Sequence, residues 1–513
     1  MKRFFLLSFL FVAPHALAGP LTLTLIHTND LHAHVDPVKV GKGTYGGYAR
    51  QITLINQLKA TKKNPLVLNG GDTFQGTLYF NVYNGLADAA FMNLVGYQAM
   101  AVGNHEFDKG PETLASFIKR VRFPLLAANL DVSGDPALKG LIQPHTVFTI
   151  ENEKVGVIGA TPPDLPELSL LGPTVKMKDL YASLNASVAA LESEGVDKIV
   201  LLSHVGYDVD QQIAAKVKGI DAIVGGHTHT LLGEKLNEDL PAGRGAYPTL
   251  VKNPEGTDTL IFQAWEWGKV VGCATLEFDA KGKIVRVPND KPIPVDETVV
   301  EDPTAASLVG ALSLPIETMR SDVVATTSVA LTRGDGETIM GDVIADAMLA
   351  KGKPAGAQLA LMNSGGVRSA IDAGPITYGE VIEVQPFNNT LVQLELKGSE
   401  LLQALEHSVS GDGGHGGRFL QVSKGFHYTF DPSKPVGRRV VRATLEGRPI
   451  EPGSTYKVVV NSFTASGGDG FEVLKNASGK RVDTGLLDVD ALIDYLKANP
   501  SLSPATEGRV VRL

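Results

Sequence analysis

The chain has 513 residues, of which 43% are hydrophobic and 20% are charged. It is too long for one hydrophobic core, so we expect at least two domains, and its composition excludes an intrinsically disordered chain. A net charge of −9 argues against nucleic acid or an anionic membrane surface as the main partner. Anion binding would therefore need cations held at a local site.

The N-terminus has the layout of a secretion signal. Lys2 and Arg3 precede an apolar run that begins at Phe4, and small residues lead up to Ala18. The apolar run is short for a membrane span. We therefore expect residues 1–18 to be a cleaved signal peptide, the mature chain to be periplasmic or secreted, and no stable membrane insertion.

From residue 21 onward, short apolar runs alternate with amphipathic stretches. Strands are expected at 21–30, 65–72, 98–106, 197–206 and 221–229, and helices at 46–60, 84–96 and 182–195. Strands that alternate with helices in this way predict an α/β fold with a largely buried sheet.

A change of composition marks a domain boundary. Residues 290–303 are rich in Pro and Asp, and residues 304–322 have a helical pattern. We therefore expect an N-terminal domain over 19–300, a linker helix over 301–325 and a C-terminal α/β domain over 326–513.

Five polar clusters in the N-terminal half each come directly after an expected strand. They supply Asp30 and His32, then Asp72, then Asn104 and His105, then His204, and finally His227 and His229. Ligands of open α/β sheets bind beyond the carboxyl ends of the strands. We therefore expect these side chains to converge on one point.

The residue types indicate a metal site. Histidine nitrogens with Asp and Asn oxygens, and no thiolate, suit Zn²⁺, Mn²⁺ or Co²⁺. Without His105, the seven candidates are too many for one tetrahedral ion, but they suffice for two divalent ions if Asp72 bridges them. Two ions about 3.5–4 Å apart clamp the attacking and leaving oxygens in displacement at phosphorus.

The run Gly103–Asp108 could instead be a solvated turn. The presence of metal-binding residue types after five strands in one chain favours a shared site over separate turns. Glu106 has no expected role beyond structural hydrogen bonding or exposure to solvent.

The motifs HTNDLHAH (27–34), GGDTFQG (70–76), GNHEFD (103–108), SHVG (203–206) and GGHTHT (225–230) resemble the metallophosphoesterase, or calcineurin-like, core. More specifically, they resemble the 5'-nucleotidase family. NSGGVR (363–368), VQPFNNTL (384–391), GRFLQVS (417–423) and NSFTASGGDGF (461–471) are similar to that family's C-terminal domain. The resemblance implies a metallophosphoesterase α/β sandwich with a dimetal centre, a linker helix and a C-terminal α/β nucleotide-binding domain.

The same resemblance implies roles for the N-terminal residues. One metal would be held by Asp30, His32, Asp72 and His229, and the other by Asp72, Asn104, His204 and His227. His105 and Asp108 would form a catalytic dyad. A cationic imidazole would stabilise charge on the phosphate, and the carboxylate would orient the imidazole.

In the C-terminal domain, the resemblance implies five substrate-binding residues: Asn363, Arg368, Phe387, Phe463 and Asp469. The two aromatic rings would sandwich a base, Arg368 would face phosphate and Asp469 would accept ribose hydroxyls. Taken without the family, Phe387 and Phe463 are expected in the core.

Three positions depart from the family pattern or have no assigned role. His229 stands where some members have Gln or Asn. Arg333 lies a few residues earlier than the family's phosphate-binding arginine. His34 lies two residues beyond an expected ligand, and the sequence does not decide its role.

We expect an exported dimetal phosphohydrolase that converts nucleoside 5'-monophosphates to nucleoside and phosphate. Alternatives are a hydrolase of UDP-sugars or nucleoside di- and triphosphates, and a 2',3'-cyclic nucleotide 2'-phosphodiesterase with 3'-nucleotidase activity. A thiosulfohydrolase and a non-catalytic nucleotide-binding protein are less favoured, because the aromatic pair and the ligand set are complete. The expected partner is a small-molecule nucleotide. The sequence leaves open the native metal, the preferred base, the number of phosphates and the oligomeric state.

Overall fold

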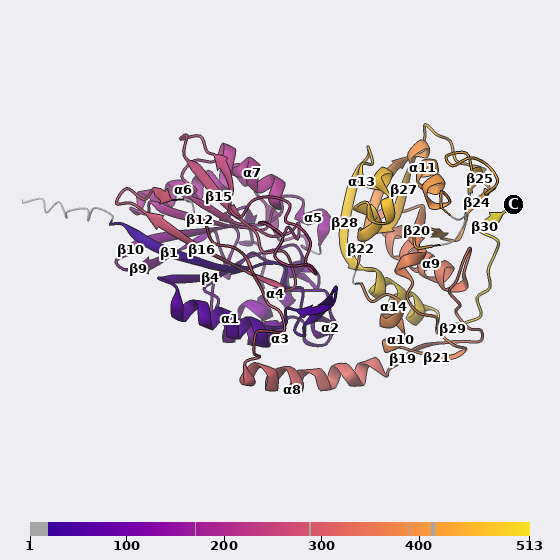
Figure 1. Cartoon of the computed structure of the whole chain (residues 1–513), viewed down its shortest axis with the longest axis horizontal. Coiled ribbons are helices and arrows are strands. Elements are labelled where there is room, and N and C mark those ends of the chain that lie inside the picture. The colour runs from indigo at the N-terminus through magenta and orange to yellow at the C-terminus, as the bar shows by residue number, and fades with distance from the viewer. Residues whose placement is uncertain (1–18, 170, 287–288, 388, 412–415) are drawn as a thin grey trace, which may run out of the picture.

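The chain folds into two lobes joined by a long helix at one side (Figure 1). The computed structural model describes residues 19–169, 171–286, 289–387, 389–411 and 416–513, so the expected signal peptide lies outside the described residues. Both lobes combine helices and sheets, which confirms the two-domain α/β architecture. Among the described residues, no helix has the length and apolar character needed to cross a membrane.

The N-terminal domain is built on two sheets. The first has the order β17 (Ile284–Arg286), β16 (Val270–Phe278), β1 (Leu21–Thr28), β4 (Pro65–Asn69), β5 (Ala99–Ala101), β6 (Leu125–Leu126) and β8 (Ile142–Gln143), with β18 (Ile293–Pro294) beside β16. The second has the order β14 (Thr249–Lys252), β15 (Asp258–Phe262), β13 (Ala222–Val224), β12 (Lys198–Ser203), β10 (Glu153–Ala160) and β9 (His145–Ile150). Smaller pairs are β2 (Val38–Val40) with β3 (Gly43–Tyr45), and β7 (Leu130–Asp131) with β11 (Lys176–Met177).

The two sheets pack face to face, and alternate side chains along each strand point to opposite faces of its sheet. In β1, Leu23 and Leu25 point into the core between the sheets, together with Leu201 of β12. Ile26 points to the opposite face, into the core beneath the helices. The helices on that face are α1 (Tyr48–Thr61), α2 (Leu78–Tyr83), α3 (Leu86–Val95) and α4 (Gly110–Ile118). The second sheet is covered by α6 (Leu180–Ser193) and α7 (Tyr207–Lys216).

The strand arrangement places the functional loops at one edge. β1, β4 and β5 run parallel to one another in the first sheet, and β12 runs parallel to β13 in the second. Their carboxyl ends therefore lie together, and the polar clusters follow those ends. The expected strand over 98–106 is shorter, because β5 ends at Ala101 and a 3-10 turn spans His105–Phe107. The Glu106 carboxylate accepts the N–H of Gly103 in this turn, so that N–H is not available to a sheet.

The C-terminal domain has a central five-stranded sheet. Its order is β23 (Leu420–Val422), β20 (Leu359–Asn363), β27 (Thr455–Asn461), β22 (Thr390–Lys397) and β28 (Arg481–Leu487). One face packs against α9 (Ile339–Gly352), α10 (Tyr378–Val384) and α14 (Asp488–Ala498). The other packs against α11 (Gly398–Ser408), α13 (Glu472–Lys475) and a sheet of β26 (Arg448–Pro449), β25 (Val440–Leu445), β24 (Phe426–Phe430) and β30 (Val510–Arg512). A three-stranded sheet contains β21 (Gly374–Thr377), β19 (Val323–Thr327) and β29 (Ser501–Leu502).

Helix α8 (Pro303–Arg320) runs between the lobes (Figure 1). It begins where the Asp302 side chain accepts the N–H of Ala305, with Pro303 in the first turn. Ala305 and Ile316 are buried in the core of the N-terminal domain. The helix therefore packs on the N-terminal domain, and near its C-terminal end Met319 packs against the core of the C-terminal domain.

Replacing Gly159 by Ala should destabilise the N-terminal domain. Gly159 lies in β10 where the two sheets approach, and an added Cβ would lie 2.2 Å from the backbone of Leu126. Overpacking of this kind costs about 3 kcal/mol at its upper end. We expect a fall of several degrees in the melting temperature of Gly159→Ala, measured by calorimetry.

The matched control is Gly310→Ala in α8, where an added Cβ meets no atom within 4 Å. Alanine is favoured over glycine in a helix by about 1 kcal/mol, so this variant should keep or slightly raise the melting temperature. Equal stability of the two variants would contradict the close approach of the sheets at Gly159.

Candidate active site

Strained loops carry the polar clusters that follow the strands. Five of the candidate ligands have backbone φ angles in the left-handed region: Asp30 at 51°, His32 at 47°, Asp72 at 53°, His227 at 73° and His229 at 46°. The conformation costs a non-glycine residue about 1–2 kcal/mol. Such strain concentrates at functional sites, where the surrounding structure holds it in place.

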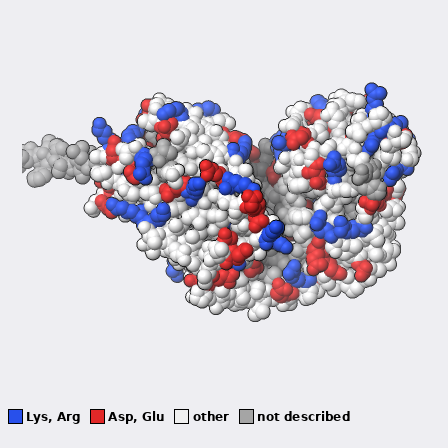
Figure 2. Space-filling view, in the orientation of Figure 1, with Lys and Arg blue, Asp and Glu red and all other residues white. Residues whose placement is uncertain are grey.

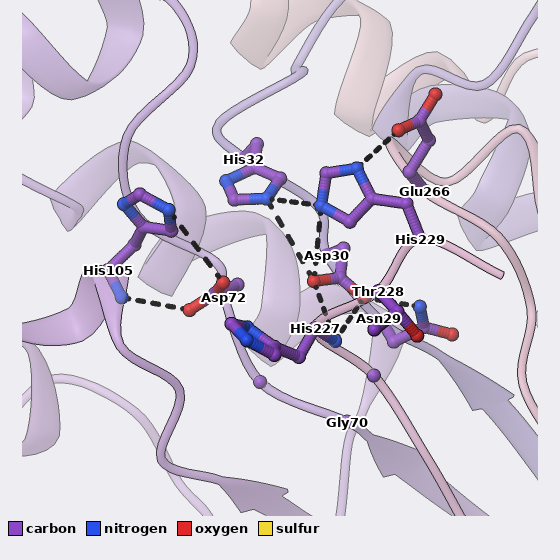
Figure 3. A network of polar contacts seen from close by, with 12 residues as sticks. Asn29, Asp30, His32, Gly70, Asp72, His105, His227, Thr228, His229 and Glu266 are labelled. Carbon is purple, nitrogen blue, oxygen red and sulfur yellow. Dashed lines mark hydrogen bonds and ion pairs between the residues drawn. The ribbon is translucent and has the colours of Figure 1, made fainter. Parts of the chain in front are cut away.

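The first group of candidate ligands is Asp30, His32 and His229, which offer ligand atoms within 4.8 Å of one another. Nε2 of His32 lies 3.0 Å from Nε2 of His229, and the latter lies 3.4 Å from Oδ1 of Asp30. Figure 3 shows both imidazoles and the carboxylate pointing toward the same space.

The second group is Asp72, His204 and His227, again with ligand atoms within 4.8 Å of one another. Nε2 of His204 lies 2.8 Å from Oδ2 of Asp72. Asp72 also forms a group with His32, so it lies between the two sets. Asn104 is buried beside them, and no described residue hydrogen-bonds its Oδ1. An unpaired buried oxygen is costly unless a ligand satisfies it.

In three of the candidate histidine ligands, Nδ1 lies within hydrogen-bond distance of an oxygen acceptor. Nδ1 of His204 lies 2.6 Å from the carbonyl oxygen of Gly70, and Nδ1 of His32 lies 3.1 Å from that of Phe74. Nδ1 of His229 lies 2.5 Å from Oε2 of Glu266. An acceptor at Nδ1 leaves Nε2 free to bind a cation. This donor set of imidazole, carboxylate and amide oxygen fits divalent cations.

His105 and Asp108 form a buried pair beside Asp72. Nδ1 of His105 lies 2.7 Å from Oδ2 of Asp108, whose Oδ1 accepts the hydroxyl of Ser169 at 2.8 Å. Burial alone would lower the pKa of His105, but Asp108 and Asp72 raise it to about 10. The two carboxylates therefore favour the protonated form of the imidazole.

The buried Glu106 carboxylate holds the Asp72 loop in place. It accepts backbone N–H groups from Asp72, Thr73, Phe74 and Gly103, at 2.7–3.3 Å. The expectation of a structural hydrogen-bonding residue is met, and the solvent-facing alternative is wrong. Sequence reasoning missed that Glu106 fixes the loop on which Asp72 stands, because the three partners in that loop lie more than 30 residues away along the chain.

His34 belongs to none of the groups of candidate ligands. Its Nδ1 lies 2.8 Å from the carbonyl oxygen of His32, and its ring stacks on Trp267 with centroids 4.2 Å apart. His34 nevertheless lines the same cleft as the candidate ligands.

A cleft of about 890 Å³ separates the two domains at the candidate ligands. Figure 2 shows the surface hollowed between the lobes. The wall opposite His105 and Asp72 includes Phe387 and Phe463, which are 47% and 46% exposed. The interpretation of these two rings as core residues is therefore wrong.

The other expected substrate residues, Asn363, Arg368 and Asp469, are not among the residues that line this cleft. Nδ2 of Asn363 donates to Oδ2 of Asp469 at 2.8 Å. The guanidinium of Arg368 lies 5.6 Å from the centroid of the Phe387 ring. Arg333 donates to the carbonyl oxygen of Arg368 at 3.1 Å, so its side chain does not point at the metal candidates.

Sequence reasoning also missed a contact that crosses the cleft. Gly485 of β28 lies directly on His105, and an added Cβ would lie 2.3 Å from Cε1 of that ring. Asp483 of the same strand adds to the carboxylates that raise the pKa of His105. The dyad of one domain is thus covered by a strand of the other, which no local pattern indicates.

Two family models match the chain: calcineurin-like phosphoesterase over residues 23–231, and the 5'-nucleotidase C-terminal domain over residues 323–476. The 5'-nucleotidase of Diplobatis ommata is 37% identical over 539 residues, covering 99% of this chain and 92% of that protein. The crystal structure of a 5'-nucleotidase precursor from Thermus thermophilus is 48% identical, covers 96% of this chain and 99% of that one, and has a TM-score of 0.65. The NAD nucleotidase of Haemophilus influenzae is 27% identical with the same coverage and a TM-score of 0.80.

Glu106→Gln should loosen the Asp72 loop. The amide would place a donor against backbone N–H groups and remove the charge that they solvate, at a cost of about 2–3 kcal/mol. We expect a lower melting temperature of the metal-free protein and about 100-fold slower turnover, because a displaced loop misplaces Asp72. Calorimetry and a phosphate-release assay measure the two effects.

Glu112→Gln in the first turn of α4 is the matched control, since Glu112 is exposed. It should leave both readouts unchanged. A Glu106→Gln variant that behaves like this control would show that the four hydrogen bonds do not hold the loop.

Proposed function

The chain belongs to the 5'-nucleotidase family, and on that premise we propose that it is a metal-dependent hydrolase that releases phosphate from nucleoside 5'-monophosphates. One observation carries the proposal: Asp72 lies between two groups of metal-binding side chains, beside the buried pair of His105 and Asp108, in a cleft faced by two exposed phenylalanine rings.

The calcineurin-like phosphoesterase fold implies divalent metal ions, and the histidine and aspartate groups are compatible with them. In this proposal one ion is held by Asp30, His32, Asp72 and His229, and the other by Asp72, Asn104, His204 and His227. Zn²⁺, Mn²⁺ and Co²⁺ suit these donors. The chemistry that two such cations would supply when bound is activation of a water molecule and neutralisation of charge on the phosphate.

The chain's own residues supply the remaining charge stabilisation. Asp108 holds Nδ1 of His105, which leaves the Nε2–H group to donate to a phosphate oxygen. A protonated imidazole, which Asp108 and Asp72 favour, would oppose the negative charge that develops during displacement. Ser169 fixes Asp108 in turn, so the pair is oriented before substrate arrives.

The opposite wall suits a nucleoside. The rings of Phe387 and Phe463 would stack on the two faces of a base, and the Gly468 backbone supports the Phe463 ring, leaving no room for a side chain. Asp469, oriented by Asn363, would accept ribose hydroxyls, and Arg368 would face phosphate. These last three residues do not line the cleft, so a rotation of the C-terminal domain would be needed to deliver the substrate to the cations.

The proposal includes export. It rests on the basic start, the apolar run and the small residue Ala18 in the first 18 residues of the sequence.

Purified protein supplied with Mn²⁺, Co²⁺ or Zn²⁺ should release phosphate from AMP. Asp72→Asn removes the carboxylate that lies between both groups, and we expect turnover to fall by about 100- to 1,000-fold. Asp208→Asn, at an exposed ion pair with Arg244, is the control and should retain full activity. If Asp72→Asn retained its activity, the proposal that both cations share the Asp72 carboxylate would be rejected.

A substrate panel tests the specificity. AMP should be preferred over UDP-glucose, ATP, 2',3'-cyclic AMP and NAD, the last included because a similar structure is that of an NAD nucleotidase. Preference for any other member of the panel would keep the hydrolytic chemistry but replace the substrate class.

Phe387→Ala and Phe463→Ala should weaken substrate binding. Stacking of a base on an aromatic ring contributes about 1–3 kcal/mol, so KM for AMP should rise by roughly 5- to 150-fold while kcat changes little. Leu314→Ala, at an exposed position of α8, is the control. An unchanged KM in both variants would mean that the rings do not contact the base.

A further inference from the structure

A short segment beside the candidate ligands, Trp265–Lys269, is unusually constrained, and its Glu266 and Trp267 line the same cleft. Trp265 has a φ of 62° and Trp267 a φ of 56°, both in the left-handed region. This conformation is a genuine outlier for a bulky side chain. The segment contributes no ligand or dyad residue in the proposed function, so its strain needs another explanation.

Lys269 is buried between the two tryptophan rings. Its Nζ lies 3.6 Å from the centroid of a Trp265 ring and 4.2 Å from that of Trp267. A buried ammonium needs both an anion and a favourable surrounding, and aromatic faces supply part of the latter. The anion is Glu266, whose Oε1 lies 2.6 Å from Nζ.

The other oxygen of Glu266 points to the candidate metal site. Oε2 lies 2.5 Å from Nδ1 of His229, as Figure 3 shows. The carboxylate is therefore held on one side by Lys269 and holds the imidazole of His229 on the other. The two carboxylate oxygens of Glu266 thus connect the buried ammonium of Lys269 to the candidate ligand His229.

The backbone of the segment also fixes a second candidate ligand. The N–H of Trp267 donates to the carbonyl oxygen of Asp30 at 2.7 Å. Asn29 donates to the carbonyl oxygen of Trp265 and to Oδ2 of Asp30. The strained segment thus contacts Asp30 and His229, which belong to one of the two groups.

We propose that Glu266 is a positioning residue for the cation held by Asp30, His32 and His229, with Lys269 and the two tryptophans fixing Glu266. This inference rests on the proposed metal site. By accepting the Nδ1–H of His229, Glu266 directs Nε2 to the cation and makes the imidazole a stronger donor. Nδ1 of His32 and His204 faces uncharged backbone carbonyls instead, so this device acts on one cation of the pair.

The test is a calorimetric titration of the metal-depleted full-length protein with Mn²⁺ or Zn²⁺ alone. Wild type should bind two equivalents. In Glu266→Gln and Glu266→Leu, one of the two sites should weaken by about 10-fold and 100-fold respectively, and the other should keep its affinity. Gln retains an acceptor oxygen for His229 and Leu does not, so the loss of affinity should be larger in Glu266→Leu.

Two further variants separate positioning from folding. Glu266→Leu leaves the Lys269 ammonium buried without its anion, so Glu266→Leu/Lys269→Met removes both charges and should show the same one-site loss. Glu234→Gln, at an exposed ion pair with Lys291, is the control and should bind as wild type does. Glu266→Gln and Glu266→Leu should both lower the melting temperature of the metal-depleted protein, because each leaves the buried Lys269 ammonium without its anion. The double variant should recover part of that loss while keeping the one-site weakening.

Wild-type affinity at both sites in Glu266→Gln and Glu266→Leu would overturn the inference. Equal weakening of both sites with a lower melting temperature of the metal-depleted protein would also overturn it, since that result indicates a general structural role. If wild type itself binds no cation, the proposed function fails, which is distinguishable from failure of the positioning role alone.

Discussion

The buried carboxylate of Asp72 is the group on which the rest of the site depends. Burial opposes its ionisation, yet His204 and His105 hold its pKa well below the usual range. Its Oδ1 accepts the backbone N–H of His105 and its Oδ2 lies 2.8 Å from Nε2 of His204. Asp72 thus connects the dyad with the group formed by His204 and His227, and the Glu106 carboxylate fixes the loop that carries it.

This arrangement requires a strained backbone that a rigid scaffold must hold. The two sheets provide that scaffold, because parallel strands in each of them end at the same edge. The left-handed residues that follow those strands turn their side chains back toward one point instead of out to solvent. The same strain extends to Trp265 and Trp267, which belong to none of the groups of candidate ligands.

Much of this could be predicted from the sequence, because the signals were local. Apolar runs of strand length marked β1, β4, β12 and β13, and the polar residue types at their ends predicted where the site would form. The structure brings those residues together, while their roles as ligands stay proposals. Glu106 and Glu266 were not predictable in the same way, since their partners are set by packing between distant segments. The exposure of Phe387 and Phe463 also depends on the cleft between the two domains, which a local sequence pattern does not describe.

A crystal structure of the Mn²⁺-loaded protein, with anomalous scattering recorded at the manganese edge, tests the central claim most directly. Two anomalous peaks about 3.5–4 Å apart are expected, with the Asp72 carboxylate between them, one beside His229 and the other beside His204. A single peak, or two peaks that do not share Asp72, would contradict it.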